Sequence, residues 1–163
     1  ITQYYVLYFV KIPNTHYSIL CTLFPIFAPM KILFVCRGNV GRSQIAEALY
    51  ILYGNKENEV FSAGTKLSGP EDLIINLPGV SHVIEVMREE GSDISAVVRN
   101  QVTPEMADLA DKIILVVDDN DPIPDYLQNN PKVIRWNVAD PKGASLEETR
   151  EIKNQIKELI MAL

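Results

Sequence analysis

The eight residues from Cys36 to Ser43, with the sequence CRGNVGRS, constrain the fold of this chain most because of what stands on either side of them. The residues before them, Ile32 to Val35, are all apolar, as in a parallel strand that is covered on both faces. From Ser43 to Tyr53 apolar residues recur at helical spacing, and Gly54 follows as a stop signal. A strand that passes through a short polar loop into a helix predicts the first unit of an α/β fold.

The rest of the chain continues this alternation. Short apolar runs predict strands at residues 60–63, 112–117 and 132–136. Helical spacing and capping residues predict helices over residues 78–90, 104–110 and 147–163. Strands that alternate with helices favour an α/β fold with a doubly wound, parallel, four-stranded sheet and helices on both faces.

The composition of the chain changes abruptly at Met30. Residues 1–29 contain a single charged side chain, Lys11, whereas charged residues are frequent after Met30. We therefore predict one domain over residues 30–163 and an apolar leader, residues 1–29, that is not part of the fold. The leader is interpreted as translated upstream sequence or a cloning remnant, with a membrane-associating segment and an ordered extra element as alternatives. Lys11 and Pro25 interrupt its apolar runs before they reach the ~20 residues that span a bilayer, which makes a membrane role the weaker interpretation.

Charge and cysteine content exclude several classes of function. The net charge of −6 disfavours binding to a nucleic-acid backbone, which requires clustered Lys and Arg. The chain has two cysteines and two histidines, too few for a zinc cluster or a disulfide framework. We therefore expect no metal, no cofactor and a reducing, cytoplasmic compartment.

The Cys36 to Ser43 loop combines a nucleophile with a site for a tetrahedral anion. Its backbone N–H groups would point inward, as at other anion sites before a helix, and together with Arg42 they would favour a thiolate at Cys36. Arg42 can bind two oxygens bidentately, and the Ser43 hydroxyl can donate to the thiolate. The predicted catalytic residues of the loop are thus Cys36, Arg42 and Ser43. The predicted substrate-binding residues are Arg37, Gly38, Asn39, Val40 and Gly41.

This loop, with Ser62 to Thr65 after the second strand and Asp140-Pro141 after the last, resembles the low-molecular-weight protein-tyrosine-phosphatase family and its arsenate reductase-like sister group. The resemblance spans residues 30–163 and implies a flavodoxin-like sheet with the loop at the carboxyl end of the first strand. It implies an enzyme without a cofactor that hydrolyses a phosphorylated protein or small phosphate monoester through a cysteinyl phosphate on Cys36.

The resemblance also assigns the general acid. By family position it is Asp140, which would protonate the leaving oxygen and then activate water as a base. A second acidic run, Asp118, Asp119 and Asp121, is interrupted by prolines and predicts a solvated loop near the rim of the site.

Two departures from the family leave the substrate open. Gly41 stands where many members have a second cysteine, and Lys142-Gly143 where many have an aromatic residue, so that Tyr126 becomes the candidate aromatic wall. Phosphotyrosine, phosphoarginine and arsenate reduced by an external thiol are the alternatives, with a non-catalytic oxyanion-binding module as a remote one. Arsenate reduction by an internal thiol relay is disfavoured, because residues 93–117 contain no cysteine.

Overall fold

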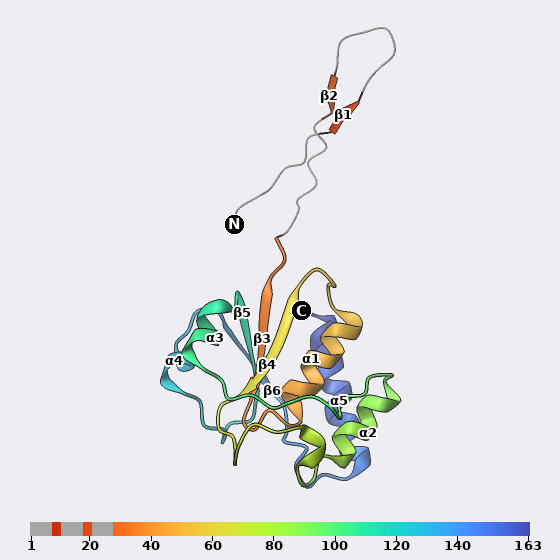
Figure 1. Ribbon diagram of the computed structural model, residues 1–163, viewed down its shortest axis with the longest axis vertical. Coiled ribbons are helices and arrows are strands. Elements are labelled where there is room, and N and C mark those ends of the chain that lie inside the picture. The colour runs from red at the N-terminus through yellow and green to blue at the C-terminus, as the bar shows by residue number, and fades with distance from the viewer. Residues whose placement is uncertain (1–7, 11–17, 21–27) are drawn as a thin grey trace.

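A computed structural model of the protein describes residues 8–10, 18–20 and 28–163 (Figure 1). In chain order the elements are β1 (Tyr8–Val10), β2 (Ser18–Leu20), β3 (Lys31–Cys36), α1 (Arg42–Tyr53), β4 (Glu59–Gly64), the 3-10 helix η1 (Ile74–Asn76), α2 (Ser81–Glu89), α3 (Pro104–Leu109), β5 (Lys112–Val117), α4 (Asp125–Gln128), β6 (Val133–Asn137) and α5 (Leu146–Met161).

Four of the strands form one parallel sheet with the order β4-β3-β5-β6. The chain winds outward from β3 to β4 on one side and through β5 to β6 on the other. The register pairs Cys36, the last residue of β3, with Gly64, the last residue of β4. Because β3 lies at the point where the winding direction reverses, its carboxyl end is where a ligand site is expected in an open α/β sheet.

Helices cover both faces of this sheet, and alternate residues of β3 point to the two layers (Figure 1). Ile32 and Phe34 are fully buried in a cluster that includes residues of α1, α2 and α5. Leu33 and Val35 are fully buried in a second cluster with residues of α3 and α4. The structure therefore confirms the predicted doubly wound, four-stranded parallel sheet with helices on both faces.

The observed elements differ from the predicted ones mainly at their ends. The helix predicted from Pro78 begins at Ser81, because Gly79 has a φ of +76° that no helix accommodates. Pro104 does open α3, and the Thr103 side chain accepts a hydrogen bond from the N–H of Met106 as its cap. The short elements η1 and α4 were not predicted, since a single turn is too short to show a helical period.

Only part of the leader is described. Within it, β1 and β2 form an antiparallel pair in which Phe9 lies opposite Ile19, and Cys21 lies outside the described residues. The assignment of residues 1–29 to a segment outside the fold therefore stays a prediction. No helix of the described residues has the length and apolar character needed to cross a membrane.

Deleting residues 1–29 tests this prediction. We expect the shortened chain to unfold cooperatively with a melting temperature within about 2 °C of the full chain, because every strand of the four-stranded sheet lies after Met30. Circular dichroism of the two proteins during heating gives the comparison. An insoluble product, or one without a cooperative transition, would show that the leader contributes to the fold.

Candidate active site

The loop between β3 and α1 starts at a buried thiol and is attached to the end of the neighbouring strand. Cys36 is only 2% exposed. Its carbonyl oxygen accepts a hydrogen bond from the N–H of Thr65 at 2.8 Å, and that of Arg37 accepts one from Lys66, also at 2.8 Å. The segment after β4 thus fixes the first residues of the loop.

Gly64 makes this close approach possible. A Cβ atom built on Gly64 would lie 2.9 Å from both the carbonyl oxygen of Arg37 and the backbone nitrogen of Asn39. These are backbone atoms, so a side chain at position 64 would push the loop away from β4. The Ser62 to Thr65 segment therefore carries a glycine because the loop lies directly against it.

Asn39 is the centre of the loop's hydrogen bonds. It is fully buried and has a φ of +51°, so the left-handed residue of the loop is Asn39 and neither of its glycines. Its amide nitrogen donates to the hydroxyls of Ser43 (2.9 Å) and Ser62 (2.8 Å). Its amide oxygen accepts from the N–H of Asn100 at 2.7 Å, which fixes the orientation of the amide. One side chain thereby joins the loop, α1 and β4.

These bonds direct the Ser43 hydroxyl at the thiol. The Ser43 Oγ lies 3.1 Å from the Cys36 Sγ and already accepts a hydrogen bond from Asn39. Its proton is therefore available to the sulfur, where it stabilises a thiolate.

Glu47 of α1 is a half-buried carboxyl that the sequence pattern did not single out. Burial raises its pKa, and a hydrogen bond with Ser62 lowers it in part. Ser62 is the same residue that accepts the hydrogen bond of Asn39, so Glu47 lies close to the residues that hold the loop. No local pattern marks this position, because its partial burial depends on the packing of α1 in the fold.

Arg42 joins the loop to two other segments. Its guanidinium is buried, with the residue 1% exposed, and its Nη1 donates to the carbonyl oxygen of Val138 at 3.1 Å. The same Nη1 lies 2.8 Å from a carboxylate oxygen of Asp121, and Nη2 lies 3.2 Å from one of Asp140. Two predicted catalytic residues, Arg42 and Asp140, are thus in contact, although nearly a hundred residues separate them in the chain.

The charges around Arg42 keep it ionised. Burial disfavours the charged guanidinium, but Cys36, Asp140 and Asp121 outweigh this effect and raise its pKa above the ordinary value. Among the described residues no group of three or more His, Cys, Asp or Glu is arranged to hold a metal ion. The carboxylates of the site converge on Arg42 instead.

The two acidic segments differ from each other in exposure. The Asp140 side chain is 40% exposed, and its second oxygen accepts from the N–H of Lys142 at 3.0 Å, so it is both fixed and open to solvent. The Asp121 side chain is 3% exposed, and the expectation that this acidic run is a solvated loop is wrong for Asp121. It holds for Asp119, which is exposed. No local pattern marks Asp121, because its partner comes from another part of the chain.

Gly41, the last residue before α1, touches the segment that carries Asp140. A Cβ atom at position 41 would lie 2.6 Å from Cγ of Pro141, closer than real contacts allow, and the proline ring cannot swing away. Pro141 is itself buried. The loop can therefore carry a side chain at position 41 only if the Asp140-Pro141 segment moves.

Replacing Gly41 by alanine should therefore lower kcat/KM on the order of tenfold or more, because the acid is displaced from the loop. Pro141→Ala removes the obstructing Cγ, so the double variant Gly41→Ala with Pro141→Ala should recover part of the loss. Steady-state kinetics of the wild type, both single variants and the double variant give a double-mutant cycle, which measures the coupling between the two positions. Activity of Gly41→Ala within twofold of wild type, or strict additivity of the two effects, would contradict the steric coupling.

The other predicted residues of the loop lie at its surface. Arg37 is exposed, while Gly38 and Val40 are half-buried.

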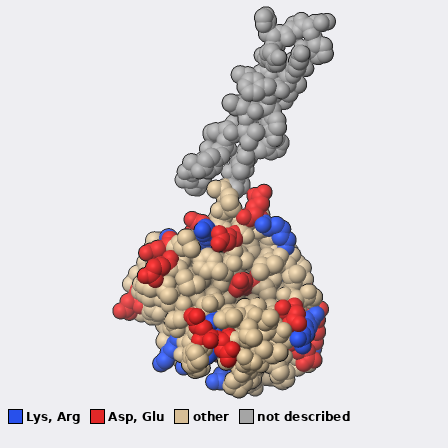
Figure 2. All heavy atoms as spheres, in the orientation of Figure 1, with Lys and Arg blue, Asp and Glu red and all other residues tan. Residues whose placement is uncertain are grey.

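Tyr126, the candidate aromatic wall, packs partly against the α3 and α4 side of the core and donates its hydroxyl to the carbonyl oxygen of Val102 at 3.1 Å. On the face drawn in Figure 2, the coloured Lys and Arg side chains are scattered among Asp and Glu.

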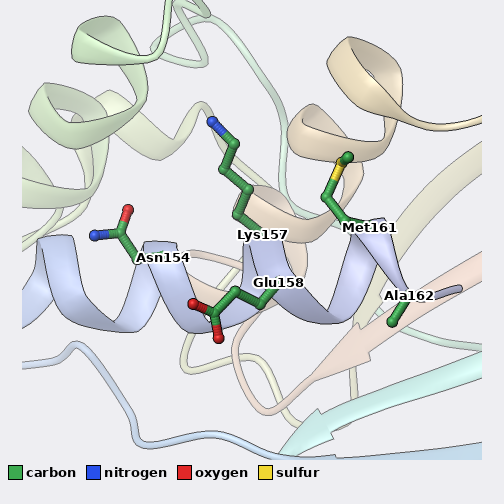
Figure 3. A pocket seen from close by; sticks show the side chains of 5 residues that line it. All are labelled: Asn154, Lys157, Glu158, Met161 and Ala162. Atoms are coloured by element: carbon green, nitrogen blue, oxygen red, sulfur yellow. The ribbon is translucent and has the colours of Figure 1, made fainter.

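A separate hollow lies on α5, lined by Asn154, Lys157, Glu158, Met161 and Ala162 (Figure 3). It is near the carboxyl end of the chain, which in Figure 1 lies away from the carboxyl end of β3, the strand whose last residue is Cys36. The Lys157 ammonium is already engaged, at 2.5 Å from Glu90 and 4.2 Å from the centre of the Tyr53 ring. The hollow is thus not part of the Cys36 site.

Comparison with known proteins gives one family over most of the chain. Residues 31–163 match the family model described as low molecular weight phosphotyrosine protein phosphatase. Arsenate reductase 1 of Staphylococcus epidermidis is 30% identical over 130 residues, which cover 79% of this chain and 91% of that protein.

Solved structures show the same similarity. A low molecular weight protein tyrosine phosphatase from T. tengcongensis is 27% identical, with a TM-score of 0.67 over 80% of this chain and 95% of that one. The YwlE arginine phosphatase from Geobacillus stearothermophilus is 26% identical, with a TM-score of 0.66 over 81% and 88% of the two chains. These relatives act on different substrates by name, so the comparisons alone do not choose a reaction.

Proposed function

Because the chain belongs to the low molecular weight phosphotyrosine protein phosphatase family, we propose that it hydrolyses phosphate monoesters through a cysteinyl phosphate on Cys36. The observation that carries the proposal is the contact between Arg42 and Asp140 at 3.2 Å. This contact brings the anion-binding arginine of the Cys36 loop to an acidic residue that is both held by a hydrogen bond and open to solvent.

In the first step the Cys36 thiolate attacks phosphorus while the bond to the ester oxygen breaks. Arg42 and the N–H groups of the loop bind the non-bridging oxygens. Asp140 in its protonated form gives its proton to the leaving oxygen, so that an alcohol or phenol departs. The product is a cysteinyl phosphate.

In the second step water attacks the cysteinyl phosphate and the phosphorus–sulfur bond breaks. Asp140, now a carboxylate, accepts the proton of the water. The departing thiolate receives the hydrogen bond of the Ser43 hydroxyl, whose Oγ lies 3.1 Å away. Because the nucleophile must stay reduced, the proposal includes a reducing compartment such as the cytoplasm.

The proposed substrate is a phosphotyrosine-containing protein, with support from the family model and from the similarity to a protein tyrosine phosphatase. Phosphoarginine is the second candidate, because two partly exposed carboxylates stand beside Arg42. The side chains of Asp118 and Asp140 are 34% and 40% exposed, and both could accept hydrogen bonds from a guanidinium leaving group. The similarity to an arginine phosphatase also supports phosphoarginine as a candidate substrate.

Arsenate reduction is a further alternative, supported by the relative from Staphylococcus epidermidis. Residues 28–163 contain no cysteine except Cys36, so an external thiol would have to complete that reaction. A non-catalytic binding module would keep the oxyanion site and show no turnover.

Phosphate release by the full chain from phosphotyrosine, phosphoarginine and phosphoserine peptides tests the proposal, with arsenate and thiol assayed in parallel. We expect release from phosphotyrosine and a phosphocysteine adduct on Cys36 in acid-quenched samples analysed by mass spectrometry. Release from phosphoarginine alone would favour the second candidate. Arsenate reduction without phosphate release, or phosphate binding without any turnover, would refute the hydrolase.

A further inference from the structure

Asp121 is the carboxylate with the shortest contact to Arg42. One of its oxygens lies 2.8 Å from Nη1, and its side chain is 3% exposed. The Asp118 carboxylate lies 3.7 Å from the same nitrogen and is 34% exposed. The Asp121 oxygen also accepts a hydrogen bond from the N–H of Asp118 at 3.0 Å, so the turn of its own loop holds it in place.

The partners of Arg42 are distributed unevenly over its guanidinium. Nη1 is engaged twice, by the carbonyl oxygen of Val138 and by Asp121. Nη2 contacts Asp140, and no described residue accepts a hydrogen bond from Nε. A guanidinium carries five N–H donors in one plane, and the pair on Nε and Nη2 suits two oxygens of one oxyanion. The edge away from Asp121 is therefore the one that remains for a phosphoryl group.

We propose that Asp121 is a positioning residue, which holds the Nη1 side of Arg42 so that the Nε and Nη2 edge faces the phosphoryl group. The inference rests on the proposed role of Arg42 in anion binding. Without this carboxylate, the guanidinium can turn toward Asp118 or Asp140, and the bidentate geometry is lost.

Positioning and simple electrostatics predict opposite effects on anion binding. Asp121 carries a negative charge close to the site of a dianion, so charge alone would oppose phosphate binding. Removing the charge should then strengthen binding. If Asp121 orients Arg42, its removal should weaken binding in spite of the lost repulsion.

Calorimetric titration of the full chain with inorganic phosphate decides between these effects. For Asp121→Asn we expect the phosphate Kd to rise about tenfold. Asp118→Asn removes the same charge nearby without the short contact, and its Kd should be unchanged or lower. Asp119→Asn, at an exposed position, is the neutral control.

Asp121→Glu covers the case in which Asp121→Asn fails to fold after losing a buried ion-pair partner. It keeps the charge and shifts the carboxylate by one methylene, so we expect an intermediate rise in Kd. Unchanged or tighter phosphate binding by Asp121→Asn, or by Asp121→Glu where the first variant is unfolded, would overturn the proposal. Because phosphate binding needs no turnover, an enzyme without phosphatase activity would refute the proposed function and leave this test intact.

Discussion

Replacing Cys36 by serine is expected to abolish turnover and to leave phosphate binding within about threefold of wild type. A serine hydroxyl is a far weaker nucleophile than a thiolate, so the rate should fall by more than about 10³-fold. Arg42 and the backbone N–H groups of the loop, which bind the anion, are unchanged by the substitution. Initial rates with a phosphorylated peptide and calorimetry with phosphate give the two measurements.

Cys21→Ser is the matched control for this variant. It replaces the other cysteine of the chain, which lies in the leader, and it should keep wild-type activity. Wild-type turnover by Cys36→Ser would refute the cysteinyl-phosphate mechanism. Loss of activity in Cys21→Ser would show that the leader takes part in the chemistry.

The fold could be predicted from the sequence because its elements carry their own periodicity. The apolar runs of β3 and β5 and the helical spacing of α1 and α5 each report on one element without knowledge of the others. The start of α2 was predicted three residues too early, because Pro78 is a helix-opening residue only where the following backbone is helical. At Gly79 it is left-handed.

The candidate site was predictable where it is contiguous. Cys36, Arg42 and Ser43 belong to one loop, so their spacing alone indicates a nucleophile within an anion site. Asp140 required the family resemblance, since an Asp-Pro pair in isolation indicates only a turn. Its catalytic role stays a prediction, and the structure adds the contact with Arg42 that motivates it.

The parts of the site that the sequence did not indicate arise from tertiary contacts. Asp121 looks like any acidic residue of a proline-containing loop until β5 brings it beside Arg42. Glu47 looks like any polar position of α1 until the fold places it near Ser62, where partial burial raises its pKa. Gly64 appears interchangeable with other small residues until the loop backbone is seen 2.9 Å from its missing Cβ. Each of these residues depends on a partner from another segment, which no local pattern encodes.

Arg42→Lys should lower kcat/KM by on the order of 10²-fold or more, even though it keeps the positive charge. Lysine has a single nitrogen on a flexible stem, whereas Arg42 contacts Val138 and Asp121 through Nη1 and Asp140 through Nη2. A loss of 10²-fold corresponds to about 2.7 kcal/mol of transition-state stabilisation, the size found when one pre-oriented donor to a developing charge is removed.

The control for this variant is Arg88→Lys, at an exposed arginine whose guanidinium pairs with Asp93 on the surface of α2. It should leave the kinetics unchanged, because a surface ion pair contributes about 0 to 1 kcal/mol and lies outside the loop. Steady-state rates and the inhibition constant of phosphate should be measured for both variants. If Arg42 binds the transition state more tightly than the ground state, kcat falls further than phosphate affinity does. A loss below about threefold in kcat/KM would indicate that the backbone N–H groups of the loop bind the anion without Arg42.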